Sequence, residues 1–144
     1  MKRIIAHRGN INGPDPEKEN TPEYILHALN SGYEAEIDVW FISNNFFLGH
    51  DEPDHLVEES FLENERLWCH AKNKEALQRM LLNKKIHCFW HQEDDYTVTS
   101  KGFIWAYPGK PAEGKAICVM PERSPGVDVD TFVGVCTDFC ERFK

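Results

Sequence analysis

Long apolar segments, basic clusters and paired cysteines are all lacking in this chain. No apolar run approaches the roughly 20 residues that a membrane-spanning helix needs, and the run Ile4 to Ala6 is too short for a secretion signal. Lysine and arginine form no cluster beyond pairs, and the net charge is −8. Nucleic acid is therefore not expected as a partner, since its binding depends on neutralised phosphates. We expect a cytoplasmic protein with no transmembrane segment.

The five cysteines are odd in number and lack the Cys-x-x-Cys spacing of zinc sites. Three of them, Cys69, Cys88 and Cys118, lie in short apolar runs. Buried, reduced thiols that act as small hydrophobic side chains are the simplest interpretation. Internal repeats and low-complexity tracts are lacking as well. With 144 residues, 41% hydrophobic and 28% charged, the chain has the composition of one globular domain over residues 1–144.

What the sequence does contain is an acidic pair on a predicted strand, within residues 34–51. Apolar residues alternate with Glu36 and Asp38, so period-two geometry puts the two carboxylates side by side on one face. Burying such ions is costly unless a positive charge compensates, so that face is either solvated or occupied by a cation. His50 follows closely. An imidazole near a cation site is typical of metal-assisted acid–base chemistry.

Strand and helix patterns alternate in the first part of the chain, which favours parallel pairing of the strands. Strands are predicted over residues 2–7, 34–41, 66–73 and 86–92. Cap signals and apolar periodicity predict helices after Asn20 and after Asn73. From Glu93 onward there are further strand candidates but no convincing helix. The pattern predicts an α/β sheet or barrel of about seven strands, and an open sheet remains an alternative.

Polar residues lie at the carboxyl ends of the first three of these strands. They are His7 and Arg8, Glu36 and Asp38, and His70 and Lys72. The carboxyl ends of parallel strands share one rim, where loops form the active site. Together these residues suit a divalent metal and a phosphate group, with imidazoles moving protons.

Four motifs follow one another in a specific order and spacing. They are His7-Arg8-Gly9, Glu19-Asn20-Thr21, Glu36-Ile37-Asp38-Val39 and His50-Asp51. This series resembles the glycerophosphodiester phosphodiesterase family, a group of phosphatidylinositol-phospholipase-C-like phosphodiesterases. Beyond residue 51 the resemblance thins to Lys72 and the final segment GVCTDF, and it is weak over residues 74–130.

The resemblance implies an α/β fold, a shortened TIM-type (β/α) barrel with about seven strands and several outer helices missing. The helices must be missing because 144 residues fall below the roughly 200 that such a barrel needs. A homodimer is left open as the cover for the exposed barrel wall. The implied function is a metal-dependent phosphodiesterase that hydrolyses a small glycerophosphodiester-like molecule by histidine acid–base catalysis.

The resemblance also assigns roles to the motif residues. His7 and His50 would be the acid–base pair, and Arg8 and Lys72 would hold the phosphate. The metal, Mg²⁺ or Ca²⁺, would be bound by Glu36 and Asp38, with Glu19 supporting either the metal site or Arg8. His70 stands where the family usually has a third carboxylate. A nitrogen ligand there would weaken Ca²⁺ binding or favour Mn²⁺ or Zn²⁺.

Alternatives remain open for single residues and for the whole protein. His70 is either a metal ligand or a core histidine with satisfied hydrogen bonds. His87 and His91 are expected to be structural or surface groups, and Glu93 to Asp95 a solvated run of charge. The alternatives to an enzyme are a non-catalytic module that binds phosphate or sugar phosphate, and a structural or regulatory protein with a vestigial site.

Overall fold

The computed structural model describes residues 2–144, which form ten strands, three α-helices and three short 3₁₀ segments. The strands are β1 (Arg3–His7), β2 (Glu34–Ile42), β3 (Asn45–Leu48), β4 (His55–Val57), β5 (Leu67–Ala71), β6 (Cys88–Trp90), β7 (Tyr96–Val98), β8 (Ile104–Ala106), β9 (Gly114–Val119) and β10 (Phe132–Thr137). The helices and 3₁₀ segments are α1 (Pro22–Asn30), α2 (Glu59–Leu62), α3 (Lys74–Leu81), η1 (Pro121–Arg123), η2 (Val129–Thr131) and η3 (Cys140–Phe143). Within the described residues, no helix is both long and apolar enough to cross a membrane.

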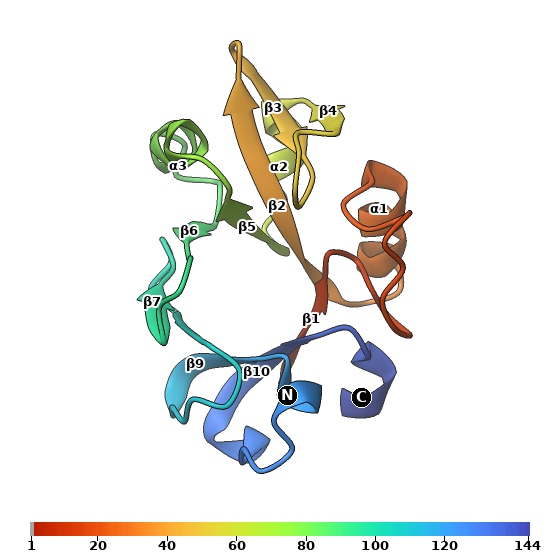
Figure 1. The fold of residues 1–144 in the computed structure, drawn as a ribbon, viewed down its shortest axis with the longest axis vertical. Coiled ribbons are helices and arrows are strands. Elements are labelled where there is room, and N and C mark those ends of the chain that lie inside the picture. Colours follow the sequence, from red (N-terminus) through yellow and green to blue (C-terminus); the bar gives the residue numbers. More distant parts are fainter. Residues whose placement is uncertain (1) are drawn as a thin grey trace.

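All ten strands belong to one mixed sheet that curls into a half-barrel (Figure 1). Seven strands run parallel in the order β6-β5-β2-β1-β10-β9-β8. The remaining three pair antiparallel: β3 with β2, β4 with β3, and β7 with β8. In the described chain no strand pairing joins β6 to β7 or β8, so the sheet stays open there. Side-chain hydrogen bonds cross the opening instead, as where the hydroxyl of Thr97 in β7 donates to the carbonyl of Trp90 in β6 at 2.9 Å.

The predicted TIM-type barrel is therefore wrong, and an open, curled sheet is the closer description. Strand–helix–strand units with a longer helix occur at β1-α1-β2 and β5-α3-β6. Elsewhere in residues 2–144 hairpins, loops, the single turn of α2 and short 3₁₀ segments connect the strands. The first departure is at Ser43 and Asn44, whose φ values of 51° and 65° make a tight turn after β2. Left-handed residues at both turn positions match the twist of a hairpin, so the chain folds back as β3.

The two longer helices begin at the cap signals predicted for them. The side chain of Thr21 accepts a hydrogen bond from the Tyr24 amide at 3.3 Å, Pro22 starts α1, and Gly32 follows its end with φ +95°. The Asn73 side chain caps α3 and also bonds both backbone groups of Phe41, at 3.2 and 3.0 Å. This side chain therefore ties the end of β5 to β2.

Alternation along the strands separates an outer core from an inner one. Outward residues of β2, such as Ile37 and Val39, pack with α1 and α3, which lie on the outside of the curl (Figure 1). Inward residues, including Ile5, Trp68 and Trp105, fill the inside of the half-barrel. Two residues further along the strands, the inward positions become polar, as at His7 after Ile5 and His70 after Trp68. All five cysteines are buried and unpaired among the described residues, as predicted.

Candidate active site at the rim of the half-barrel

Polar inward residues at the carboxyl ends of the parallel strands surround a cavity of about 370 Å³. Seven of the eight residues predicted for the site line it: His7, Arg8, Glu36, Asp38, His50, His70 and Lys72. Strand register brings the strand residues together, because His7 lies opposite Glu36 in the β1–β2 pair and Asp38 opposite His70 in the β2–β5 pair. The shared rim inferred from the sequence is therefore present.

Glu36, Asp38 and His70 form a compact group at the base of this cavity. Each offers one ligand atom, and these atoms lie within 4.8 Å of one another. The two carboxylates are 3% and 1% exposed, so they are not a solvated strand face. Two buried carboxylates need compensating positive charge. The cluster therefore has the donor set and the burial of a divalent cation site.

Asp38 is held in its ionised form by its neighbours. Burial alone would raise the pKa of this carboxyl, but hydrogen bonding and charge from His70, the charge of Arg8 and a hydrogen bond from Asn20 lower it. The contacts are Oδ1 to His70 Nδ1 at 3.2 Å, and Oδ2 to Arg8 Nε at 3.4 Å and to Asn20 Nδ2 at 2.9 Å. Asn20 also accepts from the Asp38 amide at 3.0 Å, which locks the carboxylate in place.

His70 lies among the carboxylates rather than in the apolar core. Its Nε2 donates to the carbonyl oxygen of His91 at 2.9 Å, and its ring stacks on Phe89 with centroids 5.1 Å apart. A carbonyl only accepts, so this bond leaves Nδ1 facing Asp38 and Glu36, where it can act as a ligand. Burial lowers the pKa of His70, but the two carboxylates raise it to about 9. Without a bound cation, the imidazolium itself therefore supplies the compensating charge.

His7 is oriented by Asp138, a residue that the sequence reasoning did not single out. The His7 Nδ1 lies 2.8 Å from Asp138 Oδ1, and Nε2 lies 4.0 Å from Glu36 Oε1. Burial lowers the pKa of His7, but the hydrogen bond to Asp138 and the charge of Glu36 raise it overall. Asp138 directly follows β10. Since the carboxyl ends of parallel strands share one rim, the position of Asp138 after the last predicted strand was a signal that could have marked it as a site residue.

Glu19 lies with Arg8 rather than with the acidic cluster. One carboxylate oxygen is 3.3 Å from Arg8 Nη1, and the other accepts from Asn10 Nδ2 at 2.9 Å and from the Asp15 amide at 3.1 Å. Glu19 does not line the cavity and is not part of the group formed by Glu36, Asp38 and His70. Of the two roles predicted for it, the support of Arg8 is the one that these contacts fit.

His50 and Lys72 reach the cavity from loops that follow β3 and β5. His50 is exposed, and its Nδ1 lies 2.8 Å from Asp51 Oδ1. Its loop is fixed by Gly49, whose amide donates to the Asp38 carbonyl at 3.1 Å; a Cβ there would overlap the carbonyl oxygen of Glu52. The Lys72 side chain makes no ion pair among the residues described, so its charge is free to meet an anion in the cavity.

The far wall of the cavity comes from the second half of the chain. It includes His91, Trp105, Tyr107, Met120 and Arg123. Trp105 also belongs to the inner core, whereas Arg123 is exposed. His91 was expected to be a structural or surface group, and its carbonyl oxygen does orient His70. The sequence allowed Trp105 and Tyr107 either a place at a pocket or, in preference, one in the core. No motif in this half of the chain marked His91, Met120 or Arg123 as cavity residues.

No protein-family model, no curated protein and no solved structure matches the chain. The functional argument therefore depends on the cavity, its residues and the four motifs of the sequence.

Proposed function

We propose that this protein is a metal-dependent phosphodiesterase acting on a small glycerophosphodiester-like substrate. The observation that carries the proposal is the buried group of Glu36, Asp38 and His70 in one cavity with His7 and His50. The order of the four motifs, which resembles that of glycerophosphodiester phosphodiesterases, supports the same reading.

The cation site fits a divalent ion. Glu36 and Asp38 would supply oxygen ligands and His70 Nδ1 a nitrogen, a donor set that suits Mn²⁺ or Zn²⁺ as well as Mg²⁺ and is less favourable for Ca²⁺. A divalent ion bound there would polarise a non-bridging phosphate oxygen. The carbonyl of His91 and the side chain of Asn20 keep His70 and Asp38 in ligating orientation.

Protons are moved by the two histidines that face the cavity. One of His7 and His50 takes the proton of the attacking hydroxyl, and the other protonates the departing alkoxide. Asp138 holds His7 through Nδ1, which leaves Nε2 to face the substrate. Asp51 holds His50 in the same way, through Nδ1. Each imidazole therefore has one oriented nitrogen and one that is available for proton transfer.

Arg8 and Lys72 supply positive charge for the phosphate. Their roles differ, because Arg8 is already paired with Glu19 and Asp38 whereas Lys72 has no such partner within residues 2–144. Of these two cations, Lys72 is thus the one whose charge the protein neutralises less. Positive groups fixed in this way stabilise the charge that grows on the phosphoryl oxygens in the transition state.

The test is hydrolysis of bis(p-nitrophenyl) phosphate and of a glycerophosphodiester with added Mg²⁺, Ca²⁺, Mn²⁺ or Zn²⁺. We expect turnover with at least one of these ions and its loss in His7→Ala and in Glu36→Ala. Matched controls are His27→Ala and Glu23→Ala, since both residues are exposed on α1. Unchanged turnover in both site variants would falsify the mechanism.

The second candidate is a non-catalytic module that binds phosphate or sugar phosphate. It is favoured by one observation: His70 Nδ1 lies 3.2 Å from Asp38 Oδ1 and 3.7 Å from Glu36 Oε2. At these distances a protonated His70 can take the place of a metal charge. Binding of glycerol phosphate without hydrolysis, under each metal tested, would support this module over the enzyme.

A further inference from the structure

Asn10 is completely buried next to the motif that carries His7 and Arg8, and its amide group contacts three side chains. Nδ2 donates to Glu19 Oε2 and to Asp138 Oδ1, both at 2.9 Å. Oδ1 accepts from the Tyr24 hydroxyl at 2.9 Å. Because carboxylates only accept and the Tyr24 hydroxyl donates, these partners fix which way the amide points.

Each carboxylate that Asn10 contacts holds one group of the candidate site. Asp138 uses the same oxygen, Oδ1, for Asn10 and for His7 Nδ1, the latter at 2.8 Å. Glu19 uses its second oxygen for Arg8 Nη1 at 3.3 Å. The buried amide therefore lies between the carboxylate that orients the proton-transfer group and the one that orients a phosphate-binding group.

We propose that Asn10 is a positioning residue that sets His7 and Arg8 relative to one another through Asp138 and Glu19. The proposal rests on the proposed phosphodiesterase function for the roles of those two residues. A neutral amide suits this place, since it gives two hydrogen bonds to two carboxylates and adds no charge. Aspartate here would have the same size but would put a third acidic group between them.

The backbone of Asn10 is fixed as firmly as its side chain. Its amide donates to the His7 carbonyl at 2.9 Å, and its carbonyl accepts from the Cys140 thiol at 3.4 Å. The thiol contact joins the loop to η3 at the far end of the chain. Asn10 therefore cannot move independently of the strand end that carries His7.

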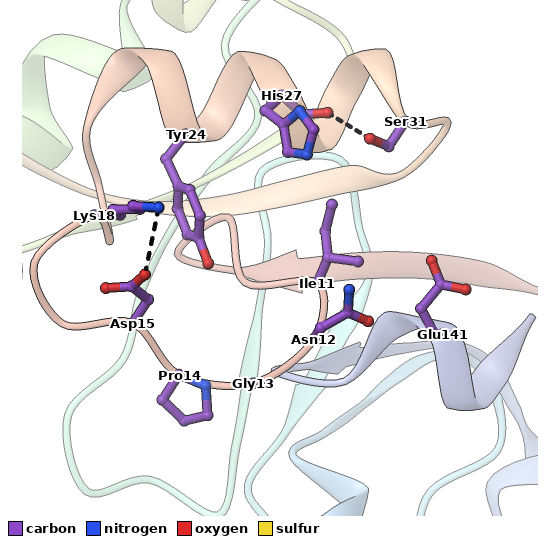
Figure 2. A pocket seen from close by; sticks show the side chains of 10 residues that line it. All are labelled: Ile11, Asn12, Gly13, Pro14, Asp15, Lys18, Tyr24, His27, Ser31 and Glu141. Atoms are coloured by element: carbon purple, nitrogen blue, oxygen red, sulfur yellow. Dashed lines mark hydrogen bonds and ion pairs between the residues drawn. The ribbon is translucent and has the colours of Figure 1, made fainter.

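Tyr24, which donates to the Asn10 side chain, lines a second cavity of about 400 Å³ beside α1. Figure 2 shows the Tyr24 ring reaching from α1 toward the loop after β1, alongside the ion pair of Lys18 and Asp15. The Tyr24 hydroxyl is the group that crosses from this cavity to Asn10. Removing the hydroxyl alone therefore loosens the amide without touching either carboxylate.

The experiment compares Asn10→Ala and Asn10→Asp with Asn12→Ala, an exposed asparagine in the same loop whose side chain makes no hydrogen bond among the described residues. In both Asn10 variants, kcat should fall by about 10-fold or more and KM should rise by about 10-fold, because His7 and Arg8 are both displaced. Asn12→Ala should change neither constant by more than about twofold. Thermal melting reports the folded fraction of each variant.

A readout that needs no turnover is the NMR signal of the His7 Nδ1 proton, which the Asp138 hydrogen bond protects from exchange. The signal should be lost in Asn10→Ala and kept in Asn12→Ala. Tyr24→Phe covers the case in which the Asn10 variants unfold. It leaves Asn10 Oδ1 without its partner, so it should stay folded at the assay temperature with a lowered melting temperature, lower kcat by about threefold and broaden the His7 signal.

The outcomes separate the two proposals. Wild-type kcat and KM in both folded Asn10 variants would overturn the positioning role, as would an unchanged Tyr24→Phe protein if the Asn10 variants do not fold. If the wild type hydrolyses no diester with any metal, the proposed function fails, and the His7 signal alone decides the role of Asn10. A His7 signal that persists in Asn10→Ala would then exclude the positioning role of Asn10.

Discussion

Replacing Asp138 with asparagine should damage catalysis far more than folding. The exchange keeps the size of the side chain but removes the negative charge 2.8 Å from His7 Nδ1. It also permits an amide N–H to face that nitrogen, which would favour the tautomer with its proton on Nε2. His7 would then offer a proton where the mechanism needs a nitrogen that can also accept one.

The size of the effect follows from the hydrogen bond that is lost. A hydrogen bond to a charged group contributes about 1.5–3 kcal/mol, and His7 makes this one from a largely buried position. If the bond is fully formed only when the imidazole carries its proton in the transition state, kcat should fall by about 10- to 150-fold. KM should change little, since Arg8 and Lys72 do not contact Asp138.

The assay is steady-state hydrolysis of bis(p-nitrophenyl) phosphate with the best metal, together with a histidine NMR titration. The pKa of His7 should fall in Asp138→Asn, because the neighbour that raises it has lost its charge. Asp130→Asn is the control, since this residue is on the surface with 88% of its side chain exposed. A folded Asp138→Asn protein with wild-type kcat would refute the orienting role of Asp138.

Three further predictions concern metal choice, pH and the loop of His50. His70→Glu should raise Mg²⁺ and Ca²⁺ affinity by about 10-fold and weaken Zn²⁺ binding, measured by calorimetry, because hard cations prefer oxygen; equal affinities would contradict the ligand role. The folded-state pKa of buried His87 lies at about 3 instead of 6.5, owing to burial and the nearby cations Lys101, Arg3 and Lys115. Its contribution to the free energy of unfolding is therefore complete above pH 6.5 and falls by about 1.4 kcal/mol per pH unit as pH decreases toward 3. Urea denaturation at several pH values gives the free energy of unfolding as a function of pH. Between pH 3 and 6.5 this free energy should depend on pH less steeply in His87→Gln, by that amount, and an equal pH dependence would contradict the role of His87. Gly49→Ala should lower kcat by about 10- to 100-fold by displacing His50, whereas normal kinetics would show that the loop adapts.

The site was predictable where it depends on local geometry. Period two along β2 is a property of the backbone, so the shared face of Glu36 and Asp38 followed directly from their spacing. Parallel pairing then brought His7 and His70 beside them. The metal-binding role, the identity of the ion and the reaction remain predictions.

The remaining parts depend on long-range packing. Asp138 meets His7 across 131 positions of sequence, and Asn10 meets Asp138 across 128, so no local pattern joins them. The barrel prediction went wrong for a related reason. Two well-marked strand–helix–strand units suggested that the alternation continues, but tight turns such as Ser43-Asn44 fold the chain into hairpins instead. Asn-rich turns between apolar runs are a hairpin signal, and here that signal outweighs the expectation of a further helix.

The most direct measurement is Mn²⁺ binding followed by paramagnetic broadening of the histidine side-chain signals. The account predicts one ion per chain and strong broadening of His7 and His70, while His27, exposed on α1, stays sharp. Glu36→Gln should abolish this pattern. Failure to bind Mn²⁺, or broadening that spares His7 and His70, would contradict the claim that one divalent ion lies among these residues.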